Sequence, residues 1–147
     1  MTECLVELYG LDMGTAYQNA FVYIRQLALH LRNAMVKKTP EAIRQLTSWQ
    51  FLNCVRVWTR LLYKYPGKDA LFPLVYPFCQ VVIGVIGVAQ SPRLIPVRLH
   101  FISCLQQVAA GAEVFVPAAS KLLDILDTPD FTAKVRCSQH QCLGDCN

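Results

Sequence analysis

Residues 70–89, ALFPLVYPFCQVVIGVIGVA, decide which of two folds the rest of the chain supports. The stretch has no charged side chain and a single glutamine, so it has the length and hydropathy of a transmembrane helix. However, Pro73, Pro77, Gly84 and Gly87 lie inside it, and its neighbours are typical of amphipathic helices in a soluble protein. A buried strand would have no second strand to pair with. We therefore predict a helix buried on all sides within a helical stack, with a membrane span over 70–89 as the alternative.

Two amphipathic helices are predicted before this stretch. Residues 15–38 have apolar side chains at helical spacing. Thr39 followed by Pro40 then indicates the start of a second helix, which extends to about Tyr63 and has Ser48 as a point of restart. The predicted buried faces are Tyr17, Phe21, Ile24, Leu27, Ala28, Leu31 and Met35 in the first helix, and Phe51, Val55, Trp58 and Leu62 in the second.

Two further helices are predicted after the stretch, over residues 95–109 and 118–127. Their inward positions are Val97, Phe101, Leu105 and Val108 in the former, and Leu122, Leu123, Ile125 and Leu126 in the latter. Five helices in series, four of them in pairs about forty residues apart, are typical of a HEAT- or armadillo-like α-solenoid. The predicted fold class is all-α, a solenoid fragment over residues 1–131.

The composition favours a piece of something larger. The chain has 147 residues, the usual size of one domain, of which 54% are hydrophobic and only 16% charged. Because an ordinary soluble domain has about 25% charged residues, a disordered chain is excluded and some apolar surface should be covered by a partner or by further chain. Roughly two and a half helix pairs are also too few to be capped at both ends. We expect a fragment of a longer domain.

The cysteines do not suggest a disulfide framework. Four of the seven stand alone, and three crowd the last eleven residues beside His140. No signal peptide is evident at the N-terminus, so a reducing compartment is expected. Residues 132–147 are interpreted as a disordered, cysteine-rich tail, with zinc binding and redox pairing as alternatives. The isolated cysteines are Cys4, Cys54, Cys79 and Cys104, and those of the tail are Cys137, Cys142 and Cys146.

Catalytic motifs are missing from the sequence. It has no GxxxxGK phosphate loop, no HExxH zinc motif and no paired-acid motif, and no Ser-His-acid constellation is suggested. His30 and His100 are interpreted as ordinary helix residues. We predict no catalytic residue, no metal site and no cofactor, and hence a protein that is not an enzyme.

Positive charge is concentrated in the middle of the chain. Residues 1–24 carry three acidic and no basic side chains, whereas residues 25–98 carry eleven basic and two acidic ones. Polar residues at intervals of three or four line one face of the second predicted helix. This face either binds the phosphate backbone of a nucleic acid or faces solvent. Trp49 and Trp58 are interpreted as core anchors. The candidate contact residues are Asn53, Arg56, Arg60 and Lys64, with Arg25 and Arg32 on a face of the first helix.

Four blocks of sequence in order carry a family resemblance. They are AYQNAFVYIRQLALHLRNA at 16–34, SWQF at 48–51 with Cys54 and Trp58, PLVYP at 73–77 followed by QVVIGVI at 80–86, and RLIPVRLH at 93–100. FVP at 115–117 and LLDIL at 122–126 match more loosely. Over about residues 10–131 the chain thus resembles the nucleolar complex protein 2 family, and it departs from that family at residues 87–92 and after Phe131.

The resemblance implies a non-enzymatic, HEAT-like scaffold for assembly of the large ribosomal subunit, located in the nucleus, in nucleolus and nucleoplasm. Its implied partners are other nucleolar complex proteins and pre-60S particles, with ribosomal RNA as a contact of the basic residues. For animal members it also implies a transcriptional corepressor on chromatin, where histone acetyltransferases are blocked. The resemblance disfavours the membrane alternative.

Overall fold

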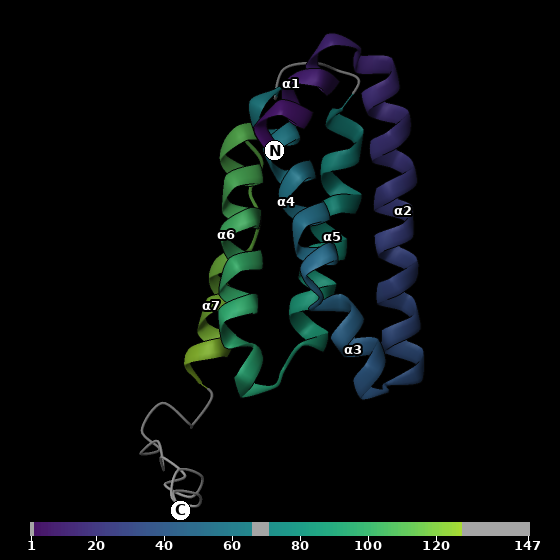
Figure 1. Cartoon of the computed structure of the whole chain (residues 1–147). Coiled ribbons are helices and arrows are strands. Elements are labelled where there is room, and N and C mark those ends of the chain that lie inside the picture. Colours follow the sequence, from purple (N-terminus) through teal and green to yellow (C-terminus); the bar gives the residue numbers. More distant parts are fainter. Residues whose placement is uncertain (1, 66–70, 128–147) are drawn as a thin grey trace, which may run out of the picture.

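The computed structural model describes residues 2–65 and 71–127, and these residues form seven α-helices, one 3₁₀ turn and no strand (Figure 1). The prediction of an all-α fold is confirmed. The tail expected over residues 132–147 lies outside the described residues. The helices are α1 (Thr2–Leu11), α2 (Met13–Lys37), α3 (Pro40–Leu46), α4 (Trp49–Lys64), α5 (Phe72–Val88), α6 (Ile95–Ala112) and α7 (Ala118–Leu126), with the turn η1 (Pro92–Leu94) before α6.

Four long helices stand side by side with alternating direction (Figure 1). The α2 helix packs along α5, and α4 packs along α6, so the helices in each of these pairs are parallel. The α4 and α6 pair is in contact near both ends: the rings of Phe51 and Phe101 meet edge to face at 6.2 Å, and Gly111 lies against Tyr63. A Cβ atom at Gly111 would lie 2.8 Å from the Tyr63 Cα, so glycine permits this close approach.

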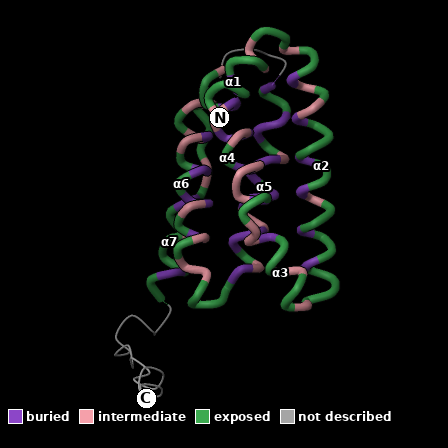
Figure 2. The backbone as a smooth tube through the Cα atoms, in the orientation of Figure 1, coloured by how far each residue is buried: buried purple, intermediate pink, exposed green. Residues whose placement is uncertain are grey.

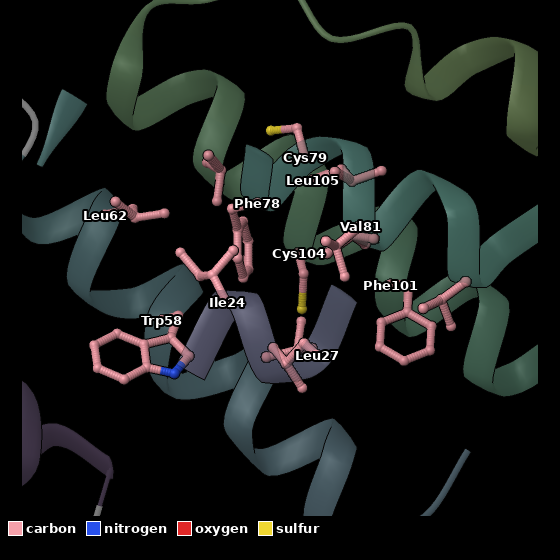
Figure 3. Packing of buried hydrophobic residues seen from close by; sticks show 14 of the residues in the cluster. Ile24, Leu27, Trp58, Leu62, Phe78, Cys79, Val81, Phe101, Cys104 and Leu105 are labelled. Atoms are coloured by element: carbon pink, nitrogen blue, oxygen red, sulfur yellow. The ribbon is translucent and has the colours of Figure 1, made fainter. Parts of the chain in front are cut away.

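The core lies between these four helices, where buried positions face inward (Figures 2 and 3). All four residues of the stripe predicted for α4 are buried, and so are Phe101, Leu105 and Val108 of α6. The stripe predicted for α2 is partly wrong. Phe21 and Met35 are exposed, whereas three alanines share the buried face with larger residues such as Leu31, whose side chain lies against Gly84 of α5. The buried residues of α2 are Ala16, Ala20, Ile24, Leu27, Leu31 and Ala34.

The α5 helix lies within residues 70–89, for which the sequence allowed either a buried helix or a membrane span. It packs against α2, α6 and α4, and within residues 2–65 and 71–127 no helix has the length and hydropathy needed to cross a membrane. The expectation that it is buried on all sides is wrong for one face, where Phe72 and Tyr76 are exposed.

The helix ends follow capping rules in three places. Thr39 Oγ1 accepts a hydrogen bond from the Ala42 N–H at 3.4 Å, and Ser48 Oγ accepts one from the Phe51 N–H at 3.3 Å, so both predicted starts are confirmed. Asp12 caps α2 by accepting from the N–H groups of Gly14 and Thr15. The Thr15 hydroxyl, which donates to the same carboxylate, is the main reason that the pKa of Asp12 is lowered.

Two helices differ from the prediction. The α1 helix was not predicted at all, although its Val6 is fully buried against the rest of the core. The α7 helix has the predicted bounds to within one residue, but of its four predicted inward residues only Ile125 is buried. The leucines Leu122, Leu123 and Leu126 are exposed, because α7 packs on α6 by one narrow side.

Candidate functional site

The α1 helix forms ion pairs with two of the four residues in the predicted polar stripe of α4. Arg60 Nη1 lies 3.1 Å from Glu3 Oε1, and Lys64 Nζ lies 3.3 Å from Glu7 Oε1. The α1 helix is held against this half of α4 by apolar contacts as well, since the ring of its Tyr9 lies 5.5 Å from that of Trp58. The charges of Arg60 and Lys64 are therefore offset within the chain.

The spacing of the charged residues in the sequence is compatible with the two ion pairs between α1 and α4. Glu3 and Glu7 are four residues apart, as are Arg60 and Lys64, so two packed helices can form both ion pairs at once. All four side chains are well exposed, and ion pairs of this kind contribute little to stability. Their main effect is to leave Arg56 as the cation of the α4 stripe without a carboxylate partner among the described residues.

Asn53 and Arg56 lie in a shallow groove between α4 and the start of α6. The groove has a volume of about 190 Å³, and we call it the Trp49 groove after its most exposed member. Trp49 is 74% exposed, so the interpretation of this residue as a core anchor is wrong. Trp58 on the same helix is buried as predicted. The residues that line the groove are Trp49, Leu52, Asn53, Arg56, Pro96, Val97 and His100.

The Trp49 groove has the parts of a site that binds unpaired nucleotides. An exposed indole offers a stacking surface to any base, a guanidinium attracts phosphate, and an amide can donate to and accept from base edges. His100 adds a second ring, and its Nε2 lies 3.9 Å from the Cys104 Sγ. Within the part of the chain that the structure describes, no carboxylate lines the groove.

Arg25 and Arg32 do not join this groove. Both are exposed on α2, which contacts α4 through Tyr23, whose ring lies 5.6 Å from that of Trp58. Because Arg25 is two residues beyond Tyr23, it lies about 200° around the helix and faces away from α4. Arg32 follows on the same face seven residues later. Around them lie exposed apolar residues, namely Phe21, Val22, Leu29, Met35 and Val36.

The described cysteines do not form a reactive cluster. Cys4, Cys54, Cys79 and Cys104 are all free thiols, and no group of three or more metal-ligating side chains is found within the described residues. Burial raises the pKa of Cys79 and Cys104, and for Cys104 the Thr59 hydroxyl and the charges of Arg56 and Arg60 oppose that rise. The three tail cysteines, on which zinc binding and redox pairing were the alternatives, lie outside the described residues.

Comparison with known proteins gives one consistent result. The family model described as the Noc2p family matches residues 1–144, a wider span than the 10–131 that carried the resemblance. Nucleolar complex-associated protein 2 of Arabidopsis thaliana is 40% identical over 124 residues, which are 84% of this chain and 16% of that protein. Nucleolar complex protein 2 of Drosophila melanogaster is 36% identical over 134 residues, which are 91% of this chain and 18% of that protein. The chain thus spans less than a fifth of the length of these two relatives.

Proposed function

Because the chain belongs to the Noc2p family, we propose that it acts in the nucleolus and nucleoplasm as a non-enzymatic scaffold in assembly of the large ribosomal subunit. Relatives that carry nucleolar complex in their names support the nucleolar role. The parallel pairing of α2 with α5 and of α4 with α6 is the arrangement that a HEAT- or armadillo-like stack requires, and we include such a stack in the proposal.

The scaffold presents two contact surfaces in this proposal. The Trp49 groove contacts single-stranded segments of precursor ribosomal RNA, by stacking on Trp49 and by phosphate contact with Arg56. The outer face of α2, where Arg25 and Arg32 lie among exposed apolar side chains, docks another nucleolar complex protein. The observation that carries the RNA contact is a 74% exposed tryptophan beside an arginine without a carboxylate partner among the described residues.

The RNA contact is tested by fluorescence anisotropy with short single-stranded oligonucleotides from precursor large-subunit RNA. Trp49→Ala should weaken binding about 5- to 150-fold, because one stacked base contributes about 1–3 kcal/mol. Arg56→Gln should weaken binding and also reduce its salt dependence. Arg25→Gln is the matched control, since it removes an exposed cation from another face and should leave the affinity unchanged.

Equal affinities of the native chain and the Trp49→Ala variant would refute the RNA contact without touching the scaffold role. The scaffold role is tested separately by affinity purification of the tagged chain from nuclear extract. Recovery of other nucleolar complex proteins with precursor large-subunit RNA is expected, and a paired Arg25→Glu and Arg32→Glu change should reduce recovery of the proteins. Recovery of histones in place of ribosomal precursors would contradict the proposal and favour a chromatin function.

A further inference from the structure

Arg98 of α6 is a buried cation that has no counter-ion among the described residues. Its side chain is 5% exposed, and its Nε is buried without a hydrogen-bond partner. Each ion pair found within residues 2–65 and 71–127 joins other residues. A guanidinium has five N–H donors and no acceptor, so a buried one needs oxygen acceptors, best supplied by an anion.

The position of Arg98 in α6 increases the need for an anion. Arg98 lies in the first turn of an 18-residue helix, where the positive end of the helix dipole adds to its own charge. No acidic residue lies in that turn, and the residue before the helix makes no side-chain cap. An isolated buried cation is strongly unfavourable, so an external anion is the physical means of balancing it.

Arg98 lines a cavity of about 270 Å³ where α5 ends, α6 begins and α7 passes, at the lower end of the bundle in Figure 1. Lys121 and Asp124 of α7 also line it, but they form an ion pair with each other at 3.0 Å. Among the described residues that line the cavity these two charges offset one another, and the guanidinium of Arg98 carries the remaining positive charge. The other lining residues are Ile86, Gly87 and Gln90, of which Gly87 and Gln90 are exposed and mark the entrance.

These features select a single carboxylate and disfavour a nucleic acid. A carboxylate carries one negative charge and two oxygens, which match the two parallel donors of a guanidinium. A nucleic-acid backbone would instead bring a row of phosphates to a cavity with one guanidinium, and past the exposed carboxylate of Asp127, the residue that follows α7. We propose that this cavity binds the carboxylate of one Asp or Glu side chain of a protein partner, with Arg98 as its ligand.

The resonance of the Arg98 Nε–H in the full chain reports this contact directly. The probe is a blocked peptide with one central glutamate, compared with its glutamine twin, inorganic phosphate and a short single-stranded RNA at constant ionic strength. The glutamate peptide should move the resonance in a saturable way, with a dissociation constant on the order of 1 mM, as expected for so small a ligand. The glutamine twin should not, and Arg93→Gln, which removes an exposed arginine nearby, should leave the shift intact.

A second variant avoids any change to Arg98 itself. Gln90→Glu adds a carboxylate at the entrance, so it should raise the Tm by about 2–8 °C and abolish the response to the peptide. Gln106→Glu, on an exposed position of α6, should do neither.

Three results would overturn the proposal. The first is that RNA or phosphate moves the Arg98 resonance and the glutamate peptide does not. The second is that Gln90→Glu leaves both the Tm and the peptide response unchanged. The third is that Asp124→Asn shifts the Arg98 resonance in the absence of peptide and shows a stability coupling with Arg98→Gln in a double-mutant cycle, which would make Asp124 an internal counter-ion.

Discussion

The two tryptophans of α4 show how one residue type takes opposite roles on one helix. Trp58 is 3% exposed and its ring lies within 5.6 Å of the rings of both Tyr9 and Tyr23, whereas Trp49 is 74% exposed at the start of the helix. Nine residues separate them, so helical geometry turns them by about 180° relative to one another. Hydrophobicity alone could not tell them apart, because both residues are equally apolar.

This difference predicts opposite effects of the same substitution. Trp58→Ala should lower the free energy of unfolding by about 3–5 kcal/mol, because it leaves a large cavity among the rings that contact it. Trp49→Ala should change it by less than about 0.5 kcal/mol, because water already surrounds most of the side chain. Urea unfolding of the two variants measures both effects, and a loss of several kcal/mol for Trp49→Ala would show that Trp49 belongs to the core.

At the scale of elements, α1 determines how much of the basic face of α4 is available. The Glu3 and Glu7 carboxylates lie where a polyanion would otherwise contact Arg60 and Lys64. The α1 helix thus leaves Arg56 as the cation of the α4 stripe without a carboxylate partner among the described residues, and in the proposed RNA contact a polyanion would approach the Trp49 groove.

Removing the two carboxylates should therefore strengthen RNA binding with little effect on stability. In Glu3→Gln with Glu7→Gln the free energy of unfolding should change by less than about 1 kcal/mol, because the ion pairs are exposed and screened. Two released cations should steepen the salt dependence of RNA affinity by about 1.4 in log–log slope. Anisotropy titrations at several salt concentrations test this, with Glu41→Gln on α3 as control. An unchanged slope would mean that RNA does not approach this half of α4.

At the scale of the whole molecule, the four cysteines within the described residues lie at different depths of the helical bundle. Cys4 is exposed on α1, Cys54 is half-buried, and Cys79 and Cys104 are buried among the four long helices. Access to Cys104 requires the long helices to separate, whereas Cys79 also lines a groove between α5 and residues 114–117 and needs a smaller opening. Access to Cys4 requires no opening.

Thiol labelling should follow this order. At pH 8 iodoacetamide should modify Cys4 rapidly, Cys79 more slowly and Cys104 most slowly, at a rate limited by separation of α4 and α6. The buried thiols are slow for a second reason, because burial raises their pKa and so reduces the reactive thiolate. Peptide mass spectrometry after timed quenching gives the rate at each site, and equal rates for Cys4 and Cys104 would mean that α4 and α6 do not pack stably.

The sequence determined the helical class, the capped starts of α3 and α4, and the buried stripe of α4. These features depend on local propensities and on periodicity along one helix, and both are determined by residues that are neighbours in the sequence. The family resemblance was also legible in the sequence, because it rests on ordered blocks of residues.

Only the tertiary structure decided which helix faces meet. It paired Glu3 and Glu7 with residues 57 positions later and buried Arg98 beside a cavity that α5 and α7 complete. Periodicity shows that a helix has an apolar face, but not which neighbour covers it or how closely. On α2, packing buried three alanines together with three larger residues and left Phe21 and Met35 outside. The charge balance and the exposure of a side chain depend on residues that are distant in the sequence. Both are therefore determined only when the helices pack together.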